Sequence, residues 1–227
     1  MKSIESLEKF IHQEIELYGD ELAITFSAQE RQSDKDQPAW QGTDNLNAFS
    51  DIINNCTLCP LAKQRNQFVF GNGNPDADIM IIGDKPGPED DESGLIFVGP
   101  DGKLLDKILA AIGLKRWDVY LCNLVKCHPE ENRSPQPFEI DRCRPYLLKQ
   151  IELIDPSIIL CLGHLAATSI LETNRPMEQL RGEVIKLGER RLVVTHHPGT
   201  LLKNRDLKRE TWHDVQLLQK LYNQKTG

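Results

Sequence analysis

The sequence lacks an apolar run long enough to cross a membrane. Its longest apolar stretches, such as Ile158–Leu162, fall far short of the roughly 20 residues that a membrane-spanning helix needs. The first 18 residues have no continuous apolar core and no small-residue cleavage site, which argues against a secretory signal. No repeat of solenoid period occurs. We therefore expect a soluble, cytoplasmic protein with no membrane partner.

The chain also lacks the excess of charge that marks a disordered protein. Of its 227 residues, 27% are charged and 39% are apolar, which fits one α/β domain with a short extension. The net charge of -7 lies mostly in residues 1–50, and the remainder is close to neutral. A local basic cluster at Lys203, Arg205, Lys208 and Arg209 could therefore still contact DNA, although a solvated helix start has the same pattern.

The charge distribution separates two regions. Residues 3–18 place apolar side chains at roughly helical spacing between acids, and the polar stretch 27–45 has the composition of a linker. We expect residues 1–45 to form an acidic helix with a flexible linker, which could dock a replication or repair protein. Residues 46–227 are expected to form the compact domain. Nothing in the pattern indicates obligate oligomerisation, so we expect a monomer.

Apolar runs alternate with helical patterns along this domain. Strands are predicted at 78–83, 119–125, 157–163 and 192–195, and helices at 102–112, 137–154, 164–171 and 206–221. Pro145 interrupts the second helical pattern, so that helix should start late or kink. Short, almost wholly apolar strands alternating with helices predict a three-layer α/β/α sandwich around a parallel sheet.

Ligands of such folds bind beyond the carboxyl ends of the strands. Three loops follow predicted strands there: the acidic Gly/Pro loop GDKPGPEDD at residues 83–91, residues 123–126, and HHPG at 196–199. Gly83 and Gly87 permit a tight turn whose backbone amides could face a ligand, and Asp84 could hold a water or a cation. A plain strand-to-helix turn would have the same composition.

Individual side chains near these loops have two interpretations. Asn123 offers an amide that complements a base edge, although loop asparagines more often bond to backbone. Phe97 could stack on a ligand or fill the core, and a histidine of the HHPG turn could donate a proton or a hydrogen bond. Leu201 and Leu202, on an expected exposed loop before the basic cluster, could form a wedge in a base stack or tuck into the core.

Four of the six cysteines could bind a metal. Cys56 and Cys59 form a C-x2-C pair, and Cys127 and Cys143 follow far along the chain. Four thiolates suit either zinc or a [4Fe–4S] cluster, and spacing does not separate these. Cys122 and Cys161 lie in apolar runs and are expected in the core.

Taken together, these segments resemble the family 4 uracil-DNA glycosylases, the iron–sulfur branch of the uracil-DNA glycosylase superfamily. The resemblance covers about residues 53–222. It rests on five segments in order: CTLCPLA, FGNGNPDADIMIIGDKPGPEDDESGLIFVGPDGKLLD, NLVKCHPEENRSPQPFEIDRCRPYL, IDPSIILCLG and THHPGTLLKNRDLKRETWHD.

The resemblance implies a four-stranded parallel sheet, a [4Fe–4S] cluster rather than zinc, and uracil-containing DNA, single- or double-stranded, as substrate. The activity would be hydrolysis of the N-glycosidic bond of a flipped uracil, the first step of base-excision repair. The implied roles are as follows: cluster ligands Cys56, Cys59, Cys127 and Cys143; catalytic Asp84 and His197; uracil-binding Gly83, Lys85, Gly87, Phe97 and Asn123; DNA-contacting Leu201, Lys203 and Arg205.

The sequence departs from the family pattern in the first loop. Asp84 stands where Glu is usual and Lys85 where a small residue is usual, and the last loop reads HPG rather than HPS or HPA. Two alternatives follow. Lys85 could form a Schiff base with the sugar and give lyase activity, or the chain could be a DNA-binding relative with altered base specificity or lost turnover.

Overall fold

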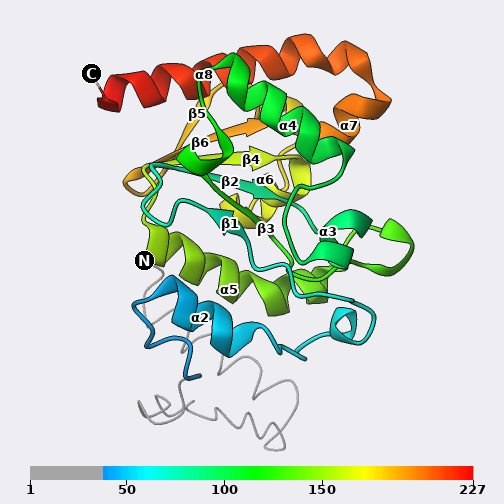
Figure 1. The fold of residues 1–227 in the computed structure, drawn as a ribbon. Coiled ribbons are helices and arrows are strands. Elements are labelled where there is room, and N and C mark those ends of the chain that lie inside the picture. The colour runs from blue at the N-terminus through cyan, green and yellow to red at the C-terminus, as the bar shows by residue number, and fades with distance from the viewer. Residues whose placement is uncertain (1–37, 227) are drawn as a thin grey trace, which may run out of the picture. The chain divides into compact units, whose positions relative to one another are not determined.

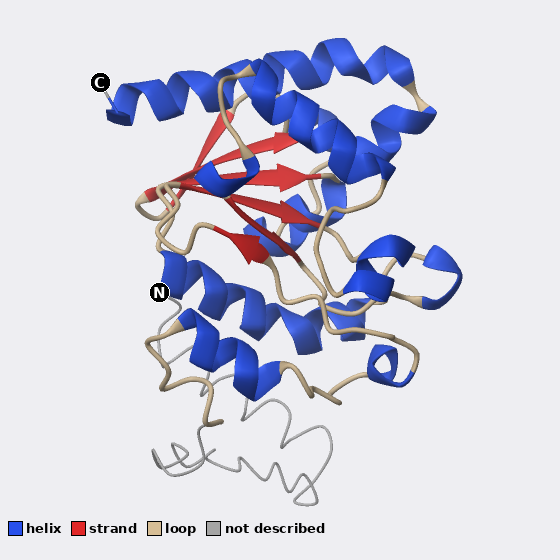
Figure 2. Cartoon of the chain, in the orientation of Figure 1, coloured by secondary structure: helices blue, strands red, loops and turns tan. Residues whose placement is uncertain are grey.

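The computed structural model describes residues 38–226, so the predicted N-terminal helix and most of the predicted linker lie outside the described residues. A six-stranded sheet in the order β1-β3-β2-β4-β6-β5 forms its centre (Figures 1 and 2). The strands are β1 (Asn72–Gly73), β2 (Ile79–Gly83), β3 (Tyr120–Asn123), β4 (Ile158–Leu162), β5 (Val184–Leu187) and β6 (Arg190–Thr195). The helices are α2 (Leu46–Ile53), α3 (Pro88–Ser93), α4 (Pro100–Ala111), α5 (Pro137–Ile154), α6 (His164–Leu171), α7 (Pro198–Lys203) and α8 (Lys208–Thr226).

The four predicted strands form the parallel centre of this sheet. β3, β2, β4 and β6 pair in parallel, in registers that align Gly83 with Asn123 and Leu162 with Thr195. The sheet exceeds the implied four strands because β1 and β5 add antiparallel edges. Neither edge has the apolar run that marks a buried strand, since β1 has two residues and β5 alternates between exposed and half-buried positions.

Helices cover both faces of the sheet and confirm the α/β/α architecture. On one face Met80, Ile82 and Cys122 pack in a core with α2, α5 and α6. On the other face Ile81 and Leu160 pack with α4 and α8. Alternate residues of each central strand therefore face opposite cores, which explains why these strands read as unbroken apolar runs.

Two local features refine the predictions. Helix α5 has the predicted bounds, Pro137–Ile154, and continues through Pro145, so of the two expected effects of this proline a late start is excluded. Pro145 and Asp141 are both exposed, and water can therefore satisfy the Asp141 carbonyl that the proline leaves without an amide partner. Trp40, interpreted as part of the linker, packs its ring against Phe49 and Tyr146, with centroids 5.8 and 5.3 Å away.

No helix within residues 38–226 combines the length and the apolar character that a membrane span requires.

Candidate active site

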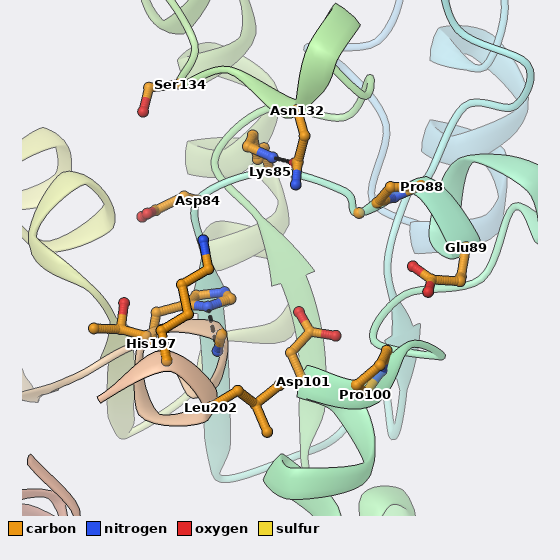
Figure 3. Close-up of a pocket in the computed structure, with 14 residues that line it drawn as sticks. Asp84, Lys85, Pro88, Glu89, Pro100, Asp101, Asn132, Ser134, His197 and Leu202 are labelled. Carbon is orange, nitrogen blue, oxygen red and sulfur yellow. Dashed lines mark hydrogen bonds between the residues drawn. The ribbon is translucent and has the colours of Figure 1, made fainter. Parts of the chain in front are cut away.

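The loops that follow β2, β3 and β6 meet at the carboxyl edge of the sheet, as the sequence predicted. They border a cavity of about 490 Å³, drawn in Figure 3. Asp84 and His197 lie on one side of the cavity, and Glu89 and Pro100 lie on the other. The predicted residues that line it are Asp84, Lys85, Gly87, His197 and Lys203.

Gly83 allows Asn123 and Phe97 to approach each other at the end of β2. A Cβ on this glycine would lie 2.4 Å from Asn123 Oδ1 and 2.8 Å from Phe97 Cζ, and any side chain there would displace both. Both residues are buried, at 0% and 2% exposure, so neither lines the open cavity. His197 lines the cavity, and its ring centroid lies 6.0 Å from that of Phe97. His197 therefore stands between the cavity and Phe97.

Among the described residues 38–226, the Asn123 side chain has no hydrogen-bond partner. Its Nδ2 and Oδ1 atoms are both buried, and neither is paired within that part of the chain. Leaving a buried amide unsatisfied costs about 1–3 kcal/mol per group, and native structures contain few such groups. An adjacent donor and acceptor, both unused, suit a ligand with the complementary pair of atoms.

Phe97 is held in a strained backbone conformation. Its φ is 53°, a left-handed value that a bulky side chain rarely adopts. Arg116 stabilises this turn by donating to the carbonyls of Ile96 at 2.9 Å and Phe97 at 2.7 Å. Gly102 is also required, because a Cβ there would lie 1.7 Å from the Phe97 carbonyl oxygen. The ring position therefore depends on contacts that sequence patterns do not reveal.

Asp90 joins the first loop to this turn. Its carboxylate accepts from the Val98 amide at 2.9 Å and the Gly87 amide at 3.1 Å. Asp90 is buried, and its carboxylate joins two segments of the cavity wall. At least this acidic residue of the loop therefore has a structural role.

His197 is the N-cap of α7 and has a defined tautomer. Its Nδ1 accepts from the Gly199 amide at 3.0 Å, so in the neutral ring the proton sits on Nε2. Burial lowers the pKa of His197 and favours this neutral form. His196 instead points to Glu210, with Nε2 3.0 Å from Oε2, which agrees with the choice of His197 over His196.

Asp84 lies beside the start of α6. Its Oδ1 accepts from the Ala166 amide at 2.9 Å. Gly163 makes room for this contact, since a Cβ there would lie 3.2 Å from Asp84 Oδ2 and 3.5 Å from His197 Cβ. Burial raises the pKa of Asp84, and the charges of His197 and Lys85 oppose that effect.

Lys85 lines the cavity and donates to Asn132 Oδ1 (Figure 3). Burial lowers its pKa. Asn132 and its neighbour Glu131 both have positive φ values, 55° and 53°. Asn132 was not among the predicted site residues, because the Asn/Glu pair in a Pro-rich loop offers only a weak turn signal.

The assignment of Leu201 as an exposed wedge is wrong. Leu201 is 1% exposed because the segment forms the helix α7, which turns this side chain toward α4 and α8. Leu202 is 48% exposed and lines the cavity. Lys203 and Arg205 are exposed, as a DNA-contacting role requires.

Two of the four candidate ligand cysteines accept a hydrogen bond at sulfur. The Cys56 sulfur accepts from the Tyr146 hydroxyl at 3.5 Å and that of Cys127 from Arg65 at 3.2 Å. Burial raises the pKa values of Cys59 and Cys143, and nearby backbone groups partly oppose that effect. Such donors tune metal-bound thiolates.

The remaining two cysteines differ. Cys122 and Cys161 are fully buried in the sheet, and burial raises both thiol pKa values. This agrees with a core role.

The four candidate cysteines are not gathered around a single ion. Within residues 38–226, no three His, Cys, Asp or Glu side chains come close enough together to hold one metal ion. Thiolates are ligands of both zinc and [4Fe–4S] clusters, so the chemistry of this donor set fits either group.

Comparison with known proteins agrees with this geometry. Residues 70–221 match the model of the uracil DNA glycosylase superfamily. The type-4 uracil-DNA glycosylase of Thermotoga maritima is 40% identical over 175 residues, 75% of this chain and 91% of that protein. The type-4 enzyme of Archaeoglobus fulgidus is 35% identical over 191 residues, 79% of this chain and 96% of that protein. The chain therefore belongs to the uracil-DNA glycosylase superfamily and, within it, to the type-4 family.

Proposed function

We propose that this protein flips uracil out of DNA and hydrolyses its N-glycosidic bond, which starts base-excision repair. The protein is a DNA glycosylase, and the observation that carries the choice of base is the buried, unpaired amide of Asn123. Uracil presents a carbonyl acceptor beside an N–H donor, the pair that Asn123 Nδ2 and Oδ1 leave unsatisfied. Cytosine would place an amine against the Nδ2 donor and lose that bond.

A flipped base reaches Asn123 only when the contact between Phe97 and His197 opens. The two ring centroids are 6.0 Å apart, too close for a base to lie between the rings. Once inserted, the base stacks on Phe97, an interaction worth about 1–3 kcal/mol. The cost of flipping, a few kcal/mol, is met by these contacts and by DNA binding.

His197 acts on the leaving base. As the C1′–N1 bond breaks, negative charge develops on a uracil carbonyl oxygen, and the neutral ring can donate Nε2–H to it. The Gly199 amide holds Nδ1 and therefore directs this proton into the cavity. A preorganised donor of this kind contributes on the order of 3 kcal/mol to the transition state.

Asp84 acts on the sugar side. Its carboxylate, fixed by the Ala166 amide, can stabilise the positive charge on the sugar and orient the water that attacks C1′. Its chain is one methylene shorter than the usual Glu, and the close approach of Gly163 brings it beside His197.

Lys85 serves as a cationic contact for the DNA rather than as a nucleophile. Its amine donates to Asn132 in the cavity wall, which supports a binding role. The alternative, a Schiff base with the sugar, is tested by borohydride trapping. Lys203 at the cavity and Arg205 beyond it contact phosphates. Leu202, exposed at the rim, replaces Leu201 as the side chain that enters the base stack.

Cys56, Cys59, Cys127 and Cys143 would hold a [4Fe–4S] cluster. When bound, it would act structurally, by joining the segment after α2, the turn after β3 and α5. The hydrogen-bond donors at the Cys56 and Cys127 sulfurs, Tyr146 and the charged Arg65, support thiolate ligands.

His197→Ala should reduce uracil release by about 10²–10³-fold, the effect of losing one oxyanion donor, with DNA affinity retained. Release is measured from a labelled oligonucleotide holding one uracil, single-stranded or paired with guanine, after alkali cleavage. His196→Ala, the matched control, should fall less than the His197 variant. Equal activity of His197→Ala and wild type would reject the assignment. Borohydride should trap no Lys85-dependent adduct.

The pH profile of kcat/KM should report Asp84. Because burial raises its pKa, activity should fall on the acid side at a pH above the ordinary aspartate value of about 3.9. Asp84→Asn should lower activity and remove that limb, whereas the matched change Glu89→Gln at the cavity mouth should keep it. An unchanged acid limb in Asp84→Asn would exclude Asp84 as the required carboxylate.

Cys127→Ser should abolish the visible absorbance and iron content of anaerobically purified protein, because one cluster ligand is lost. Cys122→Ala, which removes a core cysteine of β3, should retain both. A colourless wild type with stoichiometric zinc would contradict the cluster.

A further inference from the structure

Lys126 is a fully buried lysine between the cysteines and the base pocket. Its exposed fraction is 0%, and its ammonium donates to the Asn123 carbonyl at 2.7 Å and to Gln150 Oε1. Within residues 38–226 Lys126 forms no ion pair, and its two acceptors, a backbone carbonyl and an amide oxygen, are uncharged. Burying a cation in this way is unfavourable unless its hydrogen bonds are well placed. The mechanism described so far does not use it.

Gln150 connects Lys126 to residues 69–70. It is also 0% exposed, and its Nε2 donates to the Phe70 carbonyl at 2.9 Å. The neighbouring Val69 amide donates to the Lys126 carbonyl at 2.9 Å. The turn after β3 is thus held against both α5 and residues 69–70 by buried polar contacts.

Both partners of this contact lie close in sequence to candidate ligand cysteines. Lys126 directly precedes Cys127 in the chain. Gln150 lies seven residues after Cys143 on α5, about two helical turns along. Cysteine-bearing segments therefore anchor both ends of the contact between Lys126 and Gln150.

We infer that Lys126 and Gln150 are positioning residues that set base specificity by holding Asn123. A buried amide without partners gains free energy by turning toward any available group, so something must fix its backbone. The Lys126 ammonium fixes the backbone by its bond to the Asn123 carbonyl. This carbonyl and the unpaired side-chain amide belong to the same residue. The inference rests on the proposed reading of uracil by Asn123, and it gives the cysteine region a route to the base pocket.

Lys126→Met tests this with free uracil as the probe. The variant keeps the length of the side chain and removes the hydrogen bonds. Inhibition of base release by uracil should weaken about tenfold, the size of one lost hydrogen bond, and the ratio of uracil to cytosine release should fall. The control is Lys149→Met, which changes the lysine next to Gln150 on α5. Its amine pairs with Glu152 at 2.8 Å, so this change should leave both the inhibition by uracil and the base preference unchanged.

Iron content and circular dichroism of each variant separate positioning from loss of the cluster or fold. The inference is overturned if folded, iron-loaded Lys126→Met retains wild-type uracil inhibition and base preference. If Lys126→Met does not fold, the pair Lys126→Met with Gln150→Leu decides, because the second change removes the Gln150 Oε1 that the single variant leaves buried without its donor. A wild type that releases no uracil would instead refute the proposed function.

Discussion

The close packing of Asn123 and Phe97 on Gly83 is the constraint on which the site depends. It requires a glycine at the end of β2, a left-handed backbone at Phe97, and Arg116 and Gly102 to stabilise that backbone. It also places an amide in the interior without partners. Such an arrangement lowers stability, and a base that satisfies the amide would recover the loss. Specificity and local strain thus have a common origin.

The sheet and the helix termini place the proposed catalytic groups, Asp84 and His197. The parallel registers bring the ends of β2, β3, β4 and β6 to one edge. The first residues of α6 and α7 then supply amides, from Ala166 to Asp84 and from Gly199 to His197. Backbone donors of this kind do not need to reorganise during the reaction, which is the condition for effective electrostatic stabilisation.

The sequence predicted the parts of the fold that carry strong periodicity. The four central strands and helix α6 were identified because their residues are almost wholly apolar or helically spaced. Strands β1 and β5 lack such runs, and the continuity of α5 through Pro145 depends on that residue facing solvent. The sequence does not show which of Leu201 and Leu202 is buried, because that depends on the rotation of helix α7 about its axis. The roles of Gly163, Asn132 and Arg116 depend on tertiary contacts that no local pattern encodes.

Exchange of the donor and acceptor character of Asn123 tests the central claim most directly. Asn123→Asp replaces the amide donor by a second acceptor oxygen, so uracil loses a hydrogen bond while the exocyclic amine of cytosine gains an acceptor. Release of the two bases is measured from matched oligonucleotides with wild-type and variant protein. The account predicts a marked fall in uracil release and a rise in cytosine release. Unchanged preference for uracil in a folded variant would contradict it.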